Sequence, residues 1–190
     1  PLIVFASSVS VYGPSLKDRP PRSVEDPVFA TDNYTSHKLE CESIIKKSGF
    51  KWIITRFAVV PPLGIGGKFD PLIFEIPLNA RIEFVHTMDV GLALANIINC
   101  DKCLEKILLI GGGKNCRLFQ KEFISGFLKA AGIGMLPESA FSKKAYYTDW
   151  VDTEESQRLL NYQTRTFYDY LAEIKKAMGF KRYIISIASP

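Results

Sequence analysis

Three short, mostly apolar runs recur along this chain and constrain its fold more than any other feature. They are LIVFA at 2–6, KWIITRFAVV at 51–60 and KILLIGGG at 106–113. Runs of this length that are rich in branched side chains are typical of strands buried on both faces of a parallel sheet. Helix-like segments separate the runs, and strands that alternate with helices predict βαβ units. The sequence therefore predicts an α/β fold with a doubly wound parallel sheet.

Cap residues and apolar spacing place helices between these strands. Thr31 or Asp32 is suited to cap a helix that runs to about Lys47, where Gly49 is a natural stop. The segment 133–150 lacks a periodic pattern. A short strand is predicted at 82–86, and further helices are predicted at 69–80, 90–99, 117–132, 152–160 and 166–179.

Composition narrows the classes of partner. The chain has 190 residues, of which 47% are hydrophobic and 23% charged, as is ordinary for a globular protein. Its 24 basic residues are scattered among 20 acidic ones, so no basic stripe predicts a nucleic-acid partner. No apolar run approaches the roughly 18 to 20 residues that span a bilayer. We therefore expect a small-molecule substrate, with no nucleic acid and no membrane as partner.

The cysteines leave two interpretations open. Cys41, Cys100, Cys103 and Cys116 are too few for a disulfide framework, which favours a reducing cytoplasm. The C-x-x-C at 100–103 is compatible with a redox or zinc site, or with ordinary cysteines at a helix end. A structural zinc needs two further ligands at matching spacing, and Cys116 supplies at most one of them.

A tyrosine and a lysine lie four residues apart near the start of the first helix. Positions i and i+4 share one helix face, so Tyr34 and Lys38 are expected to point into the same space. A cation close to a phenol favours the phenolate, which makes the tyrosine a usable proton donor and acceptor. Ser7, Ser8 and Ser10 follow the first strand. Because ligands in parallel sheets bind at the carboxyl ends of strands, these groups are expected to meet at one rim.

Four ordered motifs carry a resemblance to a known family. They are SSVSVYG at 7–13, YTSHK at 34–38, ITRFAVVPP at 54–62 and FVHTMDVGLALANII at 84–98. In this order and spacing they resemble the extended short-chain dehydrogenase/reductases, which include the NAD-dependent epimerase/dehydratase family. The resemblance extends to about residue 175. It implies the C-terminal part of a Rossmann-like doubly wound parallel sheet plus a small α/β substrate-binding lobe.

The resemblance also implies catalytic roles. Tyr34 would be the acid/base that exchanges a proton with a substrate hydroxyl or carbonyl while hydride passes to or from NAD or NADP. Lys38 would bind the nicotinamide ribose and favour the phenolate, and Ser8 would bind the reacting substrate oxygen.

Further residues are implied as binding groups. Ser7 is expected on the cofactor side of the rim, although it is also suited simply to end the strand. Phe57 and Val59 would flank the nicotinamide and the substrate, while Ser10 and Arg81 would contact the substrate. Two motif residues are expected to be structural: His86 as a satisfied histidine and Asp89 as a helix cap. These two are therefore left out of the expected site.

The sequence departs from the family pattern at its beginning. The G-x-x-G-x-x-G turn that receives the cofactor pyrophosphate is missing, and the glycines of PLGIGGKF and LLIGGGKN are interpreted as turns. We expect a preceding stretch to be absent, so that the three runs are the fifth to seventh strands of a seven-stranded sheet. The expected domains are 1–60 with 82–113, and 61–81 with 114–190. The chain should bind NAD(P) weakly or not at all, and it should expose a sheet edge.

The substrate and the class of function stay open. Val9 and Ser10 stand where dehydratases carry Asp-Glu, and Val59 and Ile82 replace an Asn and an Arg of many nucleotide-sugar epimerases. A nucleotide sugar and a plain alcohol or ketone are both candidates. The leading hypothesis is an NAD(P)-dependent oxidoreductase or epimerase. The alternative is a non-catalytic binding or regulatory module, and either form is a candidate homodimer or strand-paired oligomer.

Overall fold

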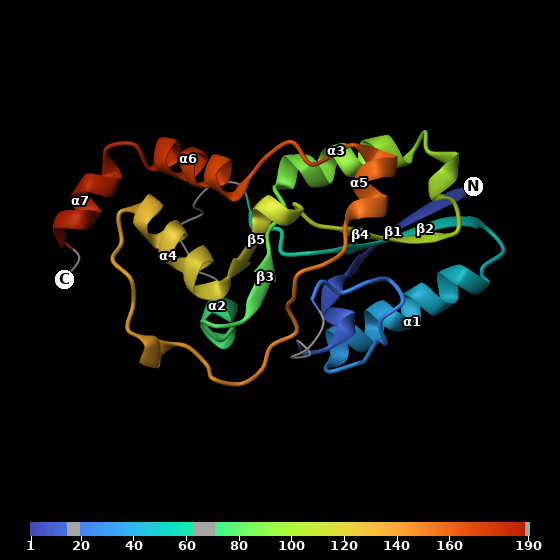
Figure 1. Cartoon of the computed structure of the whole chain (residues 1–190), viewed down its shortest axis with the longest axis horizontal. Coiled ribbons are helices and arrows are strands. Elements are labelled where there is room, and N and C mark those ends of the chain that lie inside the picture. Colours follow the sequence, from blue (N-terminus) through green and yellow to red (C-terminus); the bar gives the residue numbers. More distant parts are fainter. Residues whose placement is uncertain (15–19, 63–70, 189–190) are drawn as a thin grey trace.

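The computed structural model describes residues 1–14, 20–62 and 71–188. Its first unit is a three-stranded parallel sheet of β1 (Leu2–Ser8), β2 (Lys51–Phe57) and β4 (Lys106–Ile110), in the order β1-β2-β4 (Figure 1). The α/β class and the parallel pairing predicted from the three apolar runs are thereby confirmed. β2 ends at Phe57, three residues before the predicted limit.

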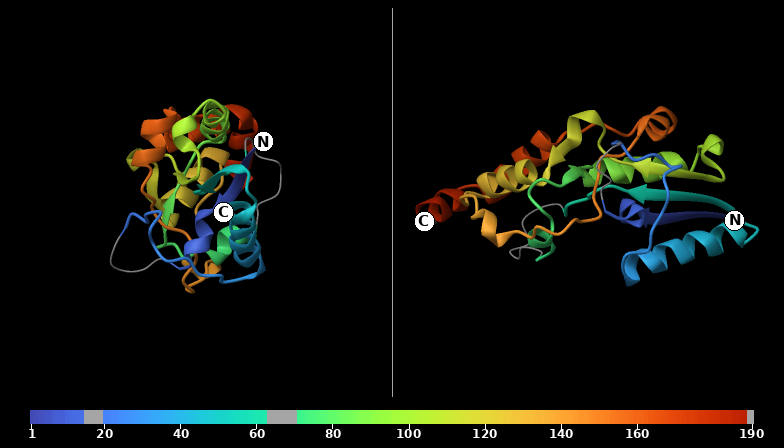
Figure 2. Two further views of the ribbon diagram at one scale, coloured as in Figure 1. Left: turned by 90° about the vertical axis from the view of Figure 1, so that its right-hand side faces the viewer. Right: turned by 60° about the horizontal axis from the view of Figure 1, so that its bottom comes forward.

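Helices cover the two faces of this sheet. The helix α1 (Asn33–Lys47) lies on one face, and α3 (Thr87–Ile97) and α5 (Glu154–Leu160) lie on the other (Figures 1 and 2). The prediction for α1 is confirmed, because Asp32 caps it and it ends at Lys47. The first core forms between these layers and contains, among others, Val11, Ile53, Ala93, Leu108, Val151 and Tyr162.

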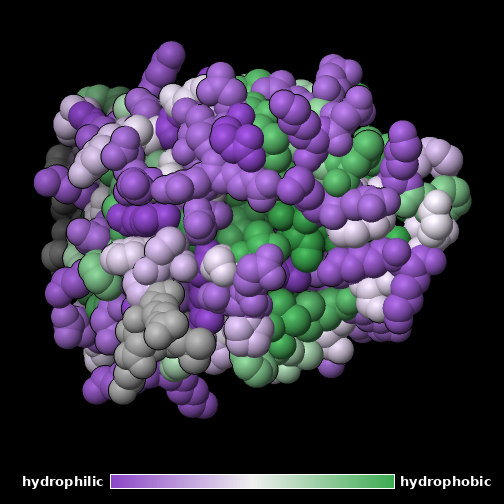
Figure 3. Space-filling model, turned by 45° about the vertical axis from the view of Figure 1, so that its right-hand side comes forward, coloured by the Kyte–Doolittle hydropathy of each residue, from purple (hydrophilic) through white to green (hydrophobic). Residues whose placement is uncertain are grey.

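The strand β1 differs from its prediction. It was expected to be buried on both faces, yet most of its apolar side chains are only half-buried and Leu2 is 38% exposed. The reason is its position: within the described sheet β1 has a neighbour on one side only. Figure 3 brings this end of the molecule forward and shows apolar side chains gathered at its surface. The expected exposed sheet edge is therefore present.

A second unit lies beside the sheet. It contains the antiparallel pair β3 (Arg81–Glu83) and β5 (Arg117–Phe119), with α2 (Leu72–Glu75), α4 (Gln120–Ala131) and α6 (Phe167–Met178), and the chain continues into α7 (Lys181–Ala188) (Figure 1). Its core includes Ile82, Phe84, Phe123, Leu128, Phe167 and Tyr170. None of the described helices has the length and apolarity needed to cross a bilayer.

Two helix predictions need correction. Of the helix predicted at 69–80, the described residues form only the short α2, Leu72–Glu75. The segment 117–132 was expected to be helical throughout, but Arg117–Phe119 pair with β3 as strand β5 and the helix begins at Gln120. A three-residue strand is too short to reveal its own period when it runs directly into an amphipathic helix. The helix does end at Gly132, whose left-handed φ of 84° suits a glycine cap.

The two cores divide the chain differently from the expected domains in two places. Residues 82 and 83 of β3 fall within the expected range 82–113 of the first domain, yet the strand pairs with β5 and packs in the second core. Conversely, Leu160 and Tyr162 follow the expected boundary at 114 but pack in the first core. The segment from 151 to 162 therefore returns to the parallel sheet between α4 and α6, two helices of the second unit.

The glycines after β4 serve packing. The amide hydrogens of residues 111–113 donate, in order, to the Tyr162 hydroxyl, the Phe84 carbonyl and the Glu83 carboxylate at 2.9–3.1 Å. A Cβ on Gly112 would lie 2.3 Å from the Phe84 carbonyl oxygen. These amides are already used inside the protein, in agreement with the interpretation of LLIGGGKN as a turn. The other glycine-rich stretch, around 63–68, lies outside the described residues.

Candidate active site

The carboxyl ends of the three parallel strands form one level rim. Ser8 pairs with Phe57, and Phe57 pairs with Ile110 on its other side. Beyond Ser8 the chain turns into a short 3₁₀ helix, Val9–Tyr12. The rim therefore brings together the segments that follow β1, β2 and β4, as expected for the ligand-binding edge of a parallel sheet.

Tyr34 and Lys38 meet beside this rim. The Lys38 ammonium donates a 2.7 Å hydrogen bond to the Ala6 carbonyl of β1. It lies 5.5 Å from the centre of the Tyr34 ring and 5.1 Å from that of Phe5. The Tyr34 ring is 52% exposed, so its hydroxyl is open to a ligand. The helix spacing thus produces the proximity that the sequence predicted, and the sheet holds the cation in place.

Two serine hydroxyls stand at the end of β1. The Ser8 hydroxyl lies 3.0 Å from that of Ser10 and accepts the Ser10 amide hydrogen at 3.2 Å. Both side chains are half-buried. Hydroxyls both donate and accept hydrogen bonds, so this pair is able to bind a substrate oxygen in either protonation state.

Ser7 lies elsewhere, in a buried polar network behind the rim. Its hydroxyl donates to Glu42 of α1 at 2.6 Å. Arg56 of β2 contacts the same carboxylate through Nε at 3.0 Å and through a terminal nitrogen at 2.7 Å, and it donates to the Tyr12 hydroxyl at 2.7 Å. Glu42 and Arg56 are each only 3% exposed. The Ser7 side chain therefore fastens α1 to the sheet and does not point to the open side of the rim.

This network extends the face of α1 that carries Tyr34 and Lys38. Glu42 follows Lys38 by four residues, as Lys38 follows Tyr34, so the three share one side of α1. Burial raises the pKa of Glu42, but hydrogen bonds from Arg56 and Ser7 outweigh it and hold the pKa below the ordinary glutamate value. The ionised Glu42 thus anchors the helix that carries Tyr34. Sequence reasoning missed this residue, although its i+8 position from Tyr34 was a usable signal.

Phe57 and Val59 leave β2 toward the two cores. Phe57 packs against the first core and Val59 against the second. The Val59 amide donates to the Glu83 carbonyl at 3.0 Å, and its carbonyl accepts from the Val85 amide at 2.9 Å. The two side chains therefore lie where the parallel sheet passes into the second unit.

Arg81 is held by an acidic partner. Its guanidinium contacts both carboxylate oxygens of Asp149, at 2.6 and 3.1 Å, and lies over the Trp150 ring. Arg22 donates to the same carboxylate at 3.2 Å. The side chain of Arg81 is 17% exposed. Asp149, in the loop before α5, thus joins β3, which carries the expected substrate-binding arginine, to the loop after β1, which carries Arg22.

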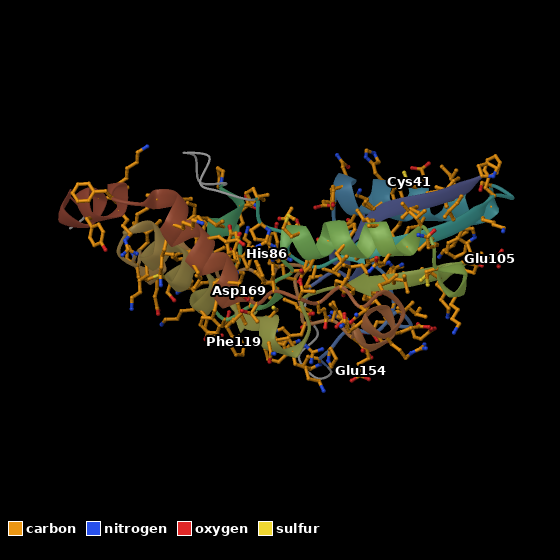
Figure 4. All side chains as sticks on the ribbon, turned by 90° about the horizontal axis from the view of Figure 1, so that it is seen from above. Cys41, His86, Glu105, Phe119, Glu154 and Asp169 are labelled. Atoms are coloured by element: carbon orange, nitrogen blue, oxygen red, sulfur yellow. The ribbon has the colours of Figure 1, made fainter. Side chains whose placement is uncertain are left out.

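His86 is a satisfied structural histidine, as expected, but it also takes the helix-capping role that was expected of Asp89. His86 is the N-cap, because its Nδ1 accepts the Met88 amide hydrogen at 3.1 Å, and its Nε2 lies 3.1 Å from Glu173 of α6. In Figure 4, His86 lies between α3 and α6, close to the label of Asp169. The expectation that Asp89 caps the helix is wrong. Asp89 is fully buried and accepts hydrogen bonds from residues 164–165 instead.

The loop before α5 reaches the start of α1. The Tyr147 hydroxyl donates to the Asp32 carboxylate, which also accepts the amide hydrogens of Tyr34 and Thr35. The Thr35 amide contributes most to the lowered pKa of Asp32, and Tyr147 adds to it. One carboxylate therefore joins the second unit to the turn that presents Tyr34, another link that sequence reasoning missed.

Other possible sites lie away from this rim. A hollow of about 710 Å³ opens over the second unit, and a smaller one of about 430 Å³ lies beside α5. Neither is lined by a residue expected in the site. Within the described ranges, no three His, Cys, Asp or Glu side chains gather as a metal site.

Known structures reproduce the arrangement of these elements. The UDP-glucose 4-epimerase from Stenotrophomonas maltophila, with bound NAD, has a TM-score of 0.72 and 17% identity over 99% of this chain. A short-chain dehydrogenase/reductase superfamily protein from Agrobacterium tumefaciens with bound NAD has a TM-score of 0.76 and 14% identity over 98% of this chain. The chain shares their fold. The Rossmann-like α/β fold expected from the four motifs is thereby confirmed.

The similarity has clear limits in length and sequence. The chain spans 65% of the epimerase and 69% of the Agrobacterium protein. RMD from Pseudomonas aeruginosa, complexed with NADPH, shows the same relation, with a TM-score of 0.74, 15% identity, and coverage of 93% of this chain and 66% of its own. No protein-family model and no curated protein matches the sequence.

Proposed function

We propose that this chain carries the proton-transfer site of an NAD(P)-dependent oxidoreductase or epimerase that acts on a hydroxyl or carbonyl group. The observation that carries the proposal is the Lys38 ammonium, held by the Ala6 carbonyl at the end of β1 and lying against the Tyr34 ring. The Ser8 and Ser10 hydroxyls at the same strand end supply a binding group for the substrate oxygen. These groups match the acid/base and oxygen-binding roles of the family resemblance.

The described residues fit one end of a nicotinamide dinucleotide. Lys38 offers an ammonium to ribose hydroxyls, and Phe57 and Val59 offer apolar surface to the nicotinamide ring. The sequence has no G-x-x-G-x-x-G motif for the pyrophosphate, and the amides of 111–113 are used internally. We therefore propose that contacts of this chain favour the nicotinamide half of either NAD or NADP.

The chemistry follows from these side chains. A bound nicotinamide cofactor would accept or donate the hydride. Tyr34 takes the proton from the substrate hydroxyl as it becomes a carbonyl, or returns it in the reverse direction. The Ser8 hydroxyl, which donates to Ser10 at 3.0 Å in this structure, turns its one hydrogen to the same substrate oxygen when substrate binds. Lys38 stabilises the negative charge that develops on the Tyr34 oxygen.

The proposal leaves two classes of substrate as candidates. The epimerase similar to this chain was solved with a UDP-linked sugar, which makes a nucleotide sugar one candidate. Arg81, however, is paired with Asp149 and offers no free charge to a diphosphate. A simple alcohol or ketone is the other candidate, and the same Tyr34 chemistry serves both.

Ligand-observed NMR of NADH with the 190-residue chain tests the proposal. Saturation should pass to the nicotinamide ring protons and not to the adenine protons, and Lys38→Met should abolish the transfer. Lys47→Met, an exposed lysine in the last turn of the same helix, is the matched control and should leave the transfer unchanged. Absent transfer, or equal transfer in Lys38→Met, would overturn the assignment.

The alternative is a binding or regulatory module that does no chemistry. The open edge of β1 favours it, because an unpaired strand is a ready surface for a second copy of the chain. It predicts a stable homodimer or strand-paired oligomer in sedimentation, together with no NADH contact. A monomer with selective nicotinamide contacts would exclude this reading.

A further inference from the structure

The turn between α3 and β4 holds two cysteines in contact. Cys100 precedes the 3₁₀ turn Asp101–Cys103, and Cys103 is its last residue. The Cys103 amide donates to the Cys100 carbonyl at 2.9 Å. Side chains three residues apart are eclipsed in a 3₁₀ helix, whose rise of about 2 Å per residue separates their Cα atoms by about 6 Å. That separation is typical of disulfides. The two sulfur atoms lie 2.7 Å apart as free thiols.

The two thiols are not equivalent. Cys103 is fully buried in the first core, while Cys100 is half-buried at its margin. The Cys103 thiol donates its hydrogen bond to the Cys100 sulfur. Burial, together with this bond, raises the pKa of Cys103 to about 12. Cys103 therefore keeps its proton, and Cys100 is the sulfur that an oxidant reaches first.

We propose that Cys100 and Cys103 are a redox pair that closes to an intramolecular disulfide when a peroxide is the oxidant. The Cys100 thiolate attacks one peroxide oxygen, the O–O bond breaks, and a sulfenic acid and hydroxide form. The Cys103 sulfur then attacks the Cys100 sulfur, the S–O bond breaks, and the S–S bond forms. The proton of Cys103 and the departing hydroxide make water. The peroxide gains two electrons and each sulfur loses one.

The other sulfur atoms do not compete for this role. Cys41 lies on α1, apart from the turn that carries Glu105 (Figure 4). Cys116 is buried, and its thiol contacts the Arg165 carbonyl at 3.8 Å. A structural zinc needs four ligands, and in the described part of the chain no third His, Cys, Asp or Glu joins the pair. Between a redox site and a zinc site, the geometry of the C-x-x-C favours redox chemistry.

The pair is separate from the proposed catalytic rim. The turn precedes β4, so it lies at the amino end of that strand, whereas Tyr34 and Ser8 gather at the carboxyl ends. Disulfide formation at the turn leaves the Tyr34–Lys38 arrangement unchanged. The redox role of the cysteine pair therefore does not depend on the proposed function.

Peptide mapping of the peroxide-treated chain tests the proposal. Trypsin cleaves after Lys102, between the two cysteines, so the two flanking peptides stay joined only when the disulfide is present. After mild peroxide treatment and blocking with N-ethylmaleimide, we expect the joined pair, lighter by two hydrogens than the separate thiol peptides. Reduction should separate it. Cys41→Ser should behave as the wild type.

A second variant tests the order of events. In Cys103→Ser the Cys100 sulfenic acid has no resolving thiol, and it should be captured by dimedone. The proposal is overturned if Cys100 and Cys103 are both alkylated at peroxide doses that oxidise Cys41. It is also overturned if the oxidised product is a Cys41-linked dimer with the 100–103 peptides separate. The wild-type map decides these outcomes even if Cys103→Ser folds poorly.

Discussion

Replacing Glu42 by leucine should destabilise the protein more than most single changes. The substitution leaves the Arg56 guanidinium, which is only 3% exposed, without its carboxylate partner. Removing one member of a buried ion pair typically costs about 3–5 kcal/mol, because the remaining charge stays desolvated and unpaired. A domain's whole unfolding free energy is about 5–15 kcal/mol, so the loss is a large part of it.

The loss of stability in Glu42→Leu should be measurable as a shift of the urea unfolding midpoint. With a loss of about 4 kcal/mol and a urea dependence of about 2 kcal/mol per molar, the midpoint should fall by about 2 M. Fluorescence of Trp52, which lies in β2, reports the unfolding. The double variant Glu42→Leu with Arg56→Met removes both charges and should recover much of the loss, since apolar pairs replace buried ion pairs well.

Acid should weaken the same network in the wild type. Because the pKa of Glu42 is lowered in the folded protein, its contribution is present above the unfolded glutamate pKa and is lost as pH falls through the folded value. Glu42→Leu should lack this part of the acid sensitivity. A midpoint shift below about 0.5 M, or a double variant no more stable than the single one, would refute the reasoning.

Three smaller perturbations follow from other contacts. Gly112→Ala should lower the free energy of unfolding in urea by about 3 kcal/mol, because its Cβ would lie 2.3 Å from a backbone oxygen. Gly91→Ala is the control: a Cβ there meets no atom within 4 Å, and the free energy of unfolding should rise by up to about 1 kcal/mol. Burial raises the pKa of Glu83, so wild-type stability should decline as pH rises from the ordinary glutamate value through the raised one, and Glu83→Gln should flatten that slope. Tyr147→Phe should lower stability by about 1 kcal/mol and speed proteolysis of the loop before α5.

Local patterns predicted the elements well because their causes are local. The apolar runs became β1, β2 and β4, and Asp32 capped α1, since strand composition and cap chemistry act within a few residues. Burial of β1 was overestimated because it depends on how many neighbours a strand has. A run of branched residues does not indicate how many neighbouring strands it will have.

The site was predicted in part for the same reason. Tyr34 and Lys38 meet because helix spacing alone brings them together. The partners of Ser7 and Arg81 are 35 and 68 residues away in the chain, so no local pattern indicates that Glu42 and Asp149 engage them. Asp89 and His86 both have cap chemistry, and the choice between them depended on donors at 164–165.

The open edge of β1 has a consequence for amide hydrogen exchange. Along a strand, successive amides point to alternate sides, so within the described sheet only every second amide of Leu2–Ser8 faces β2. The inward set should exchange slowly and the outward set quickly. A strand added at this edge would slow the outward set as well, so that both sets of amides would exchange slowly. Exchange rates along seven residues thus distinguish a bare edge from an occupied one, without knowledge of what occupies it.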